Sequence, residues 1–236
     1  MTQGTCIELR QLAFQWPGAS TPLLHIPHLQ IERGERVLLR GASGSGKSTL
    51  LSLIAGVHQA KPNQVPVLGQ DLAKLSQRQR DRLRANEVGY IFQQFNLLPY
   101  LSAVQNVMLA AKFAPARVQR LAKATGTPRE LALQLLQQLG LSEQDSLRPA
   151  HQLSVGQQQR VAAARALFGH PALIIADEPT SALDSDHRDN FIEVLFDACQ
   201  AHGTTLLFVT HDGSLAHHFE RAIELGEINQ ATGVQQ

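Results

Sequence analysis

One short stretch limits what this chain can fold into more than any other, the sequence GASGSGKSTLLSLIAG at residues 41–56. It matches the pattern GxxxxGK[ST], with an apolar run over 36–40 before it and a helical pattern over 47–55 after it. Glycines let backbone N–H groups curve around a phosphate, and the helix that follows points its positive end at the same anion. This order of strand, loop and helix predicts an α/β protein that binds a nucleotide. It disfavours a flexible glycine–serine loop with an incidental lysine.

The residue types within this loop divide the work of holding a nucleotide. Lys47 brings a full positive charge to the β- and γ-phosphates, and the hydroxyl of Ser48 can bind Mg²⁺. Backbone N–H groups supply most of the other contacts. The residues expected to bind the nucleotide in this stretch are Gly41, Ala42, Ser43, Gly44, Ser45, Gly46, Lys47, Ser48 and Thr49.

A second stretch, PALIIADEPTSALD at residues 171–184, supplies carboxylates. Asp177 ends an apolar strand pattern, where an aspartate can help to hold Mg²⁺ at the carboxyl edge of a parallel sheet. Glu178 follows it directly and can act as general base on an attacking water. An acidic turn after a strand would give the same pattern, but the phosphate loop earlier in the chain favours the catalytic interpretation.

Short apolar runs alternate with helical patterns along most of the chain, as expected for a parallel sheet covered by helices. Residues 96–170 differ, because their pattern is nearly all helical. We expect strands over 7–14, 36–40, 88–92, 172–177 and 204–210, and helices over 47–55 and 185–201.

The clearest helix of the middle region starts at the sequence TPRE. Thr127 and Glu130 form a capping box around Pro128, and Gly140 supplies the stop at the other end. Between them the pattern predicts one buried apolar stripe, made of Leu131, Leu135 and Leu139.

The composition narrows the possible partners. With 21 Lys and Arg against 20 Asp and Glu, the formal charge is +1, which argues against nucleic acid as a partner.

The start of the chain lacks a signal-peptide pattern, and no run of about 18 apolar residues occurs. Residues 88–111 carry no formal charge, but their several Gln and Asn side chains do not suit a bilayer interior. Cys6 and Cys199 form no metal-ligand spacing, which favours a reducing compartment.

A third stretch, HQLSVGQQQRVAAARAL at residues 151–167, resembles the signature of ATP-binding cassette (ABC) ATPases, LSGGQ followed by QQR and an alanine-rich helix. The resemblance covers nearly the whole chain, with the motifs of the family in order. It implies a P-loop NTPase (RecA-like) core with an N-terminal antiparallel β subdomain and an inserted α-helical subdomain. The single ABC ATPase domain, residues 1–236, then consists of a core lobe (1–95 and 171–228), a helical subdomain (96–170) and a tail (229–236).

The signature is also a helix start, with Ser154 as N-cap and Gln157 as its capping-box partner. Spacing alone favours an ordinary capped helix. The resemblance implies instead that this segment completes the phosphate site of a second copy of the chain, so that two ATP molecules lie between two head-to-tail copies. Val155 stands where the family usually has glycine, and we expect it to alter the ATPase rate or the dimer affinity. The residues implied to bind ATP in trans are Ser154, Val155, Gly156 and Gln157.

The resemblance assigns roles to four further residues. Gln93 in YIFQQF is similar to the Q-loop glutamine, which reaches Mg²⁺ and the attacking water. Asp184 in SALD is similar to the D-loop aspartate at the subunit interface, and His211 in LLFVTHD to the histidine that contacts the γ-phosphate. Trp16 in LAFQWPG occupies the place of the aromatic residue that stacks on adenine, although it could instead pack inside the chain. The implied catalytic residues are Glu178, His211 and Gln93, and the implied Mg²⁺ ligands are Ser48, Gln93 and Asp177.

The sequence around Gln93 is most similar to a subgroup that serves lipoprotein release, macrolide efflux and bacterial cell division. This similarity implies a membrane permease as partner, bound through an apolar contact that includes residues 97–101, and it implies periplasmic components in the complex. We expect an exporter-like or mechanotransmitting ATPase on the cytoplasmic face of the bacterial inner membrane. Within the family, the ATPase of an importer is the competing interpretation.

Functions outside transport fit the length and the motifs of the chain less well. ABC proteins of DNA repair insert long coiled coils between P-loop and signature, and the stretch from Lys47 to Leu153 is too short for one. Translation factors of the family usually carry two cassettes in one chain. A small-molecule P-loop kinase would leave the LSVGQ segment and His211 without a role, so transport is the favoured interpretation.

Overall fold

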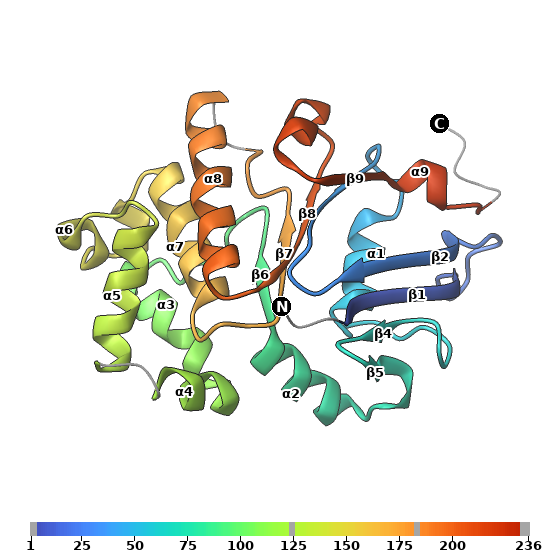
Figure 1. Cartoon of the computed structure of the whole chain (residues 1–236), viewed down its shortest axis with the longest axis horizontal. Helices are drawn as coiled ribbons and strands as arrows, with labels where there is room; N and C mark the ends of the chain where they lie inside the picture. The colour runs from blue at the N-terminus through green and yellow to red at the C-terminus, as the bar shows by residue number, and fades with distance from the viewer. Residues whose placement is uncertain (1–3, 123–125, 182–184, 232–236) are drawn as a thin grey trace. The chain divides into compact units, whose positions relative to one another are not determined.

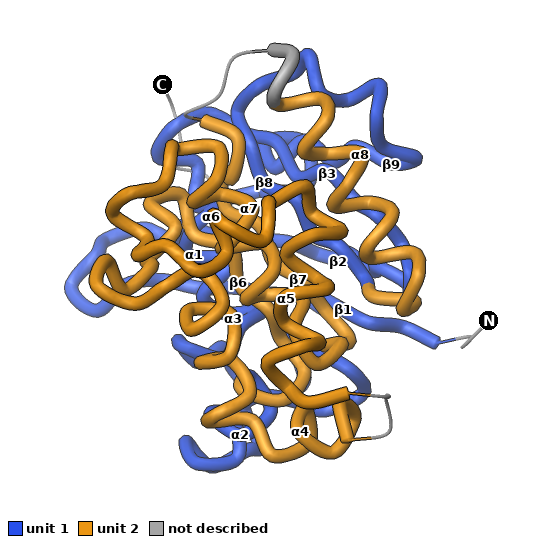
Figure 2. Tube along the Cα trace, turned by 90° about the vertical axis from the view of Figure 1, so that its left-hand side faces the viewer, with its two compact units in different colours: residues 1–84, 205–236 blue, residues 85–204 orange. Residues whose placement is uncertain are grey.

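The computed structural model describes residues 4–122, 126–181 and 185–231, and for residues 185–187 it describes the backbone alone. Asp184, the predicted D-loop aspartate, lies outside the described residues. The chain divides into two compact units, residues 1–84 with 205–236 and residues 85–204 (Figure 2).

The first unit contains a small antiparallel sheet in the strand order β2-β1-β4-β5 (Figure 1). β1 (Thr5–Phe14) pairs along its length with β2 (Leu24–Glu32), and β4 (Pro66–Val67) and β5 (Gln70–Asp71) are short. This sheet is the antiparallel β subdomain that the family resemblance predicts. The apolar side chains that β1 and β2 bury are Ile7, Leu9, Leu12, Leu24, Ile26, Leu29 and Ile31.

Three parallel strands of the same unit carry the phosphate loop. β3 (Arg36–Arg40) lies between β8 (Thr205–Thr210) and β9 (Arg221–Glu224). All six residues of β8 are buried, which confirms the prediction of an apolar strand there. The helices of this unit are α1 (Lys47–Ile54), α9 (Leu225–Ile228) and the 3₁₀ helices η1 (Leu72–Lys74) and η3 (Gly213–His218), and α2 (Gln77–Glu87) crosses the boundary to the second unit.

The second unit is mostly helical around a parallel pair of strands, β6 (Val88–Ile91) and β7 (Leu173–Asp177). Its helix α3 packs mainly against α7 and α5, and also touches α4 and α6. The predicted helical character of the middle of the chain is therefore confirmed. The helices are α3 (Ala103–Lys112), α4 (Pro115–Leu121), α5 (Pro128–Gln138), α6 (Glu143–Ser146), α7 (Val155–Leu167), α8 (Ser185–Ala201) and the 3₁₀ helix η2 (Ala150–Gln152).

Helix α5 begins and ends as predicted but buries a different stripe. Thr127 caps it in a capping box, and Gly140 follows its end at a φ of 80°. The predicted Leu131 and Leu135 are only half-buried, so the expected stripe is wrong at these two positions. The reason is that α5 packs against both α3 and α7, so the buried line runs through positions 132 and 136 instead of 131 and 135. The side chains buried along this line are Ala132, Leu136 and Leu139.

A histidine pair in the second unit makes the stability depend on pH. The rings of His170 and His202 lie 3.7 Å apart between centroids. Burial, together with the charges of His202 and Arg120, lowers the pKa of His170 from 6.5 to about 4. Between these values the unfolded chain binds a proton that the folded chain does not bind, so stability is lost as the pH falls through this window.

The substitution His170→Asn should flatten this dependence, and asparagine tolerates the φ of 53° at this position. In urea unfolding between about pH 7 and pH 4.5, the parental chain should lose about 1–2 kcal/mol more than the variant. Above pH 7, where neither state carries the proton, the stability of both chains should change equally little with pH. Equal losses at low pH would contradict the burial of an uncharged His170.

Candidate functional site

The phosphate loop joins β3 to α1 in the first unit. Its last glycine, Gly46, is the N-cap of α1 at a φ of 99°. A Cβ on Gly41 would lie 2.8 Å from the hydroxyl of Ser45, and a Cβ on Gly46 would lie 2.9 Å from a leucine of β2. Gly46 needs glycine because of its φ and its close neighbour, a side chain at Gly41 would displace the hydroxyl of Ser45, and Gly44 has room for a Cβ but a φ of 78° that favours glycine. The loop is a cradle of bare backbone at the positive end of α1, which fits a phosphate group.

Lys47 and Ser48 complete this cradle. The ammonium of Lys47 donates hydrogen bonds to the carbonyl oxygens of Gly41 and Ala42, at 2.6 and 2.9 Å. These bonds hold a positive charge against the loop itself, where the phosphates of a nucleotide would lie. Ser48 is exposed in the first turn of α1, so its hydroxyl fits the expected Mg²⁺ ligand.

Trp16 lies in the same unit, two residues after the end of β1. Its ring makes edge contacts with Phe14 and His58, at centroid distances of 5.1 and 4.8 Å. The side chain nevertheless keeps 38% of its surface exposed. Trp16 therefore combines both interpretations offered by the sequence, because its ring is held by packing and remains open for stacking.

His211 directly follows the last residue of β8 and is exposed. The chain turns sharply after it, because the carboxylate of Asp212 accepts a hydrogen bond from the backbone N–H of Ser214 at 2.8 Å and caps η3. The fold thus presents His211 at the carboxyl end of a parallel strand, where such sheets bind their ligands.

The two acidic residues lie at the same end of the strand pair in the second unit. Asp177 is the last residue of β7 and is half-buried. The hydroxyl of Tyr90, on β6, donates a hydrogen bond to its Oδ2 at 3.4 Å. Burial and the charge of Asp177 raise the pKa of Tyr90 well above its usual range, so this hydroxyl stays a donor. A carboxylate oriented in this way fits a Mg²⁺ ligand.

Glu178 has a left-handed backbone, with a φ of 47°. Such a φ is rare for a residue with a side chain and is maintained by surrounding contacts. One of them comes from Gln159 on α7, which is 1% exposed and donates a hydrogen bond to the carbonyl oxygen of Pro179 at 2.8 Å. The helix that carries the signature therefore also fixes the turn that presents the candidate general base.

Gln93 is exposed two residues after the end of β6. The chain beyond it is unusual, because Phe95 and Asn96 both have positive φ, 57° and 50°. Arg165 of α7 donates hydrogen bonds to both of their carbonyl oxygens, each at 2.6 Å. Gln93 therefore stands at the beginning of a loop with a fixed backbone.

The signature has the helix start that its spacing predicts. Ser154 is the N-cap of α7, and a complete capping box links it to Gln157. Gln157 also donates a hydrogen bond to Asp145 at 2.9 Å. Val155 is 48% exposed, so its side chain is available to a second molecule. The first turn of α7 offers backbone N–H groups to an anion.

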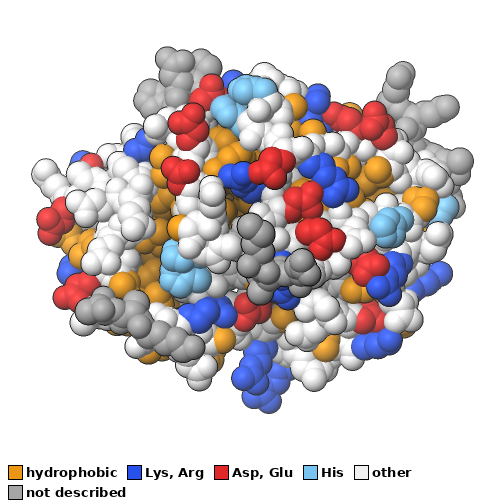
Figure 3. Space-filling view, viewed as in Figure 1, with side chains coloured by type: hydrophobic (Ala, Val, Ile, Leu, Met, Phe, Trp, Pro, Cys, Tyr) orange, Lys and Arg blue, Asp and Glu red, His pale blue; other side chains and the backbone are white. Residues whose placement is uncertain are grey.

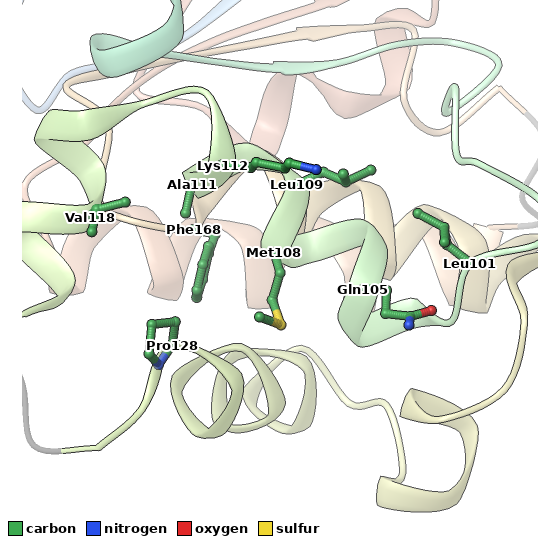
Figure 4. A pocket seen from close by; sticks show the side chains of 9 residues that line it. All are labelled: Leu101, Gln105, Met108, Leu109, Ala111, Lys112, Val118, Pro128 and Phe168. Carbon is green, nitrogen blue, oxygen red and sulfur yellow. The ribbon is translucent and has the colours of Figure 1, made fainter.

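An apolar groove lies on the second unit between α3, α4 and α5, with a volume of about 530 Å³. Figure 4 shows Met108 and Phe168 pointing into it from α3 and from the end of α7. We call it the α3 groove. Its lining residues are Leu101, Gln105, Met108, Leu109, Ala111, Lys112, Val118, Pro128 and Phe168.

The predicted site residues thus fall into two groups, one on each unit. The phosphate loop, Trp16 and His211 belong to the first unit, and Gln93, the two acidic residues and the signature belong to the second. Three residues that position the second group are not predicted by the sequence patterns, namely Tyr90, Gln159 and Arg165. Gln159 and Arg165 lie inside the signature stretch, so that motif is the available signal for them.

Three further features of the molecule are its surface charge, the lengths of its helices and the grouping of its possible metal ligands. The face in Figure 3 carries positive and negative side chains side by side, in keeping with the balanced charge. Within the described ranges, no helix is long and apolar enough to cross a membrane, and no cluster of His, Cys, Asp and Glu could hold a metal ion by itself.

A glycine cradle with a bound lysine, at the end of a parallel strand and before a helix, defines a P-loop nucleoside triphosphatase. A family model described as ABC transporter matches residues 24–181, and the chain belongs to this family, as an ATP-binding and ATP-hydrolysing subunit.

Several relatives agree with this assignment. An uncharacterized ABC transporter ATP-binding protein of Escherichia coli (strain K12), YbbA, is 44% identical over 84% of this chain and 83% of its own length. A macrolide export ATP-binding/permease protein of Burkholderia pseudomallei (strain 1710b), MacB, is 40% identical over 95% of this chain, which corresponds to 33% of that longer protein. A solved dimeric, post-hydrolysis structure of the ATP-binding cassette MJ0796 bound to ADP and Pi covers 98% of this chain and 99% of its own, with a TM-score of 0.79 and 32% identity.

Proposed function

We propose that this chain drives a membrane permease by binding and hydrolysing ATP between two copies of itself. The complex would be exporter-like or mechanotransmitting, would include periplasmic components, and would hold this chain at the cytoplasmic face of the bacterial inner membrane. The main observation in favour of a permease partner is that region 88–111 has no charged residue, is partly exposed and borders the α3 groove. The macrolide export ATP-binding/permease protein among the relatives, whose name combines an ATP-binding part with a permease, supports the same partner.

In the proposed ATP site, the residues of this chain bind and orient the substrate. Lys47 and the loop amides hold the phosphates, and Trp16 stacks on the adenine. Glu178 takes a proton from the attacking water, and His211 orients that water beside the γ-phosphate. A bound Mg²⁺ would neutralise phosphate charge, and its ligands would be Ser48, Gln93 and Asp177.

A second copy completes each site in this proposal. The signature of the second copy presents the N–H groups at the start of α7 to the γ-phosphate, through Ser154, Val155, Gly156 and Gln157. Asp184 contributes at the same interface. The exposed side chain of Val155 would lie at this seam, which explains why valine in place of glycine should alter the rate or the dimer affinity. The dimeric form of the solved relative supports this arrangement.

The permease would bind across the loop after Gln93 and the α3 groove. Tyr100 is 71% exposed, and Phe92 and Leu98 are also exposed, although large apolar side chains are normally buried. Charged residues are depleted at the cores of protein interfaces, and this region has none between residues 88 and 111.

The substitutions Tyr100→Glu and Met108→Glu are expected to abolish permease binding while ATP hydrolysis by the isolated chain changes less than about twofold. Val57→Glu is the matched control, because Val57 is an exposed apolar residue of the other unit. The measurement is co-purification from detergent-solubilised membranes, with the partner identified by mass spectrometry. Recovery with ribosomes or DNA would contradict the transport proposal, and a permease accompanied by a soluble binding protein would favour import.

A further inference from the structure

The segment that leads into the signature and the loop after Gln93 are hydrogen-bonded to each other within the second unit. Ala150 donates its backbone N–H to the carbonyl oxygen of Leu101 at 2.9 Å, and Ala103 donates to Arg148 at 3.1 Å. Between these bonds, Ser102 and Pro149 form an isolated antiparallel bridge. The residues just before the signature therefore run as a short antiparallel pair beside residues 99–103.

His151 adds a side-chain contact to this pairing. Its backbone N–H donates to the carbonyl oxygen of Pro99 at 3.2 Å, and its ring Nδ1 lies 2.7 Å from the same oxygen. A carbonyl oxygen only accepts, so Nδ1 carries the proton in this contact. His151 is exposed, and it precedes Ser154, the N-cap of α7, by three residues. The start of the signature helix is therefore tied to the loop through a side chain that the core does not require.

The other end of α7 is tied to the same loop. Arg165, in the last turn of the helix, bonds the carbonyl oxygens of Phe95 and Asn96 at 2.6 Å each. These are the two residues with positive φ, a conformation that needs outside support. Burial lowers the pKa of the Arg165 guanidinium, but its two short bonds to carbonyl dipoles remain those of a charged donor.

The loop between these two ties is held as one piece by Asn106 of α3. Its side chain is fully buried and bonds Leu98 through both backbone groups, at 2.8 and 3.1 Å. The same amide donates to the carbonyl oxygens of Leu101 and Ser102, at 3.2 and 3.1 Å. A displacement at one end of residues 95–102 is therefore passed to the other end rather than absorbed.

We propose that His151 and Arg165 are positioning residues that make the 95–102 loop and the signature move together. Closure of the signature on a nucleotide would then move the exposed side chains of the loop. Force on the loop would in turn shift the signature, because coupling between two sites is reciprocal. This inference rests on the proposed ATP-bound dimer and names the contacts within one chain that would transmit its closure.

The test measures amide hydrogen exchange in the full-length Glu178→Gln chain with and without MgATP. Peptides covering 97–103 and 153–158 report the loop and the signature. With His151 intact, MgATP should slow exchange in both peptides. With the added substitution His151→Ala, the signature peptide should keep its protection. In the loop peptide, the slowing of exchange by MgATP should become about fivefold smaller. His151→Asn should restore the effect, because the asparagine amide nitrogen takes the position of Nδ1.

Each outcome of this experiment is decisive. Equal protection of the loop peptide in the parental chain and in His151→Ala would overturn the inference, as would a loop that does not respond while the signature does. A signature peptide that does not respond to MgATP in any variant would overturn the proposed ATP-bound dimer, and the inference with it. Arg165→Lys, which keeps the charge but reaches one carbonyl at a time, should give a partial loss of loop protection.

Discussion

The Glu178→Gln chain is expected to bind MgATP and form a stable dimer, but to hydrolyse ATP about 10²–10⁴-fold more slowly than the parental chain. Glutamine has the shape of glutamate but cannot take a proton from water. The turn that carries this residue should be unchanged, because its φ of 47° is supported by backbone contacts and by the bond from Gln159 to Pro179. The loss should therefore fall on the chemical step and spare nucleotide binding.

Phosphate release measures the rate, and gel filtration with MgATP measures the dimer. Glu193→Gln is the matched control, because it makes the same chemical change at an exposed position of α8. It should leave both quantities unchanged. A Glu178→Gln chain that hydrolyses ATP at the parental rate would remove Glu178 from the role of general base. A variant that is inactive and also monomeric with MgATP would instead contradict the proposed dimer with ATP between two copies.

The parts of the fold and site that sequence predicts are those in which the signal is local. The phosphate loop is such a case, because the strand 36–40, the glycines and the start of α1 at Lys47 are contiguous. The start of α7 is another, because a capping box needs only Ser154 and Gln157. Buried strands such as β8 are also local, since they are apolar at almost every residue.

The parts that sequence does not predict depend on residues far apart in the chain. Nothing in a single pattern indicates that Tyr90 donates to Asp177, because the two meet only when β6 and β7 pair in parallel. The buried face of α5 differs from the predicted one for the same reason, since two neighbouring helices decide which line of the helix is covered. β2 escapes prediction because His25, Pro27 and His28 interrupt its apolar pattern.

Arg117 is the clearest long-range feature, since its sequence context, a short polar helix, suggests an exposed side chain. It is only 3% exposed, and its guanidinium donates to three carbonyl oxygens from other parts of the unit. The distances are 3.2 Å to Ala166, 3.0 Å to Phe168 and 2.8 Å to Val88. The backbone of Gly169 fits against it so closely that a Cβ there would lie 2.5 Å from the Cβ of Arg117.

The substitution Arg117→Ala is expected to lower the free energy of unfolding by about 3–5 kcal/mol, a large part of the stability of an ordinary domain. Burial and the nearby Arg120 already lower the pKa of Arg117 to about 10, so the buried charge carries a cost that its three bonds must offset. Removing the side chain does not recover that cost, because three buried carbonyl oxygens lose their donor and a cavity remains. Urea unfolding monitored by circular dichroism measures the change.

Arg129→Ala is the control for this prediction, because Arg129 is an exposed arginine of the same unit and should change stability by about 0.5 kcal/mol or less. Arg117→Met separates packing from hydrogen bonding, since it refills most of the volume without supplying a donor. If the hydrogen bonds dominate, methionine should recover less than half of the lost free energy of unfolding. Full recovery would show that Arg117 acts only as a space-filling residue. Phe168, whose carbonyl accepts one of the three bonds, also lines the α3 groove, so loss of Arg117 should loosen the wall on which the proposed permease docks.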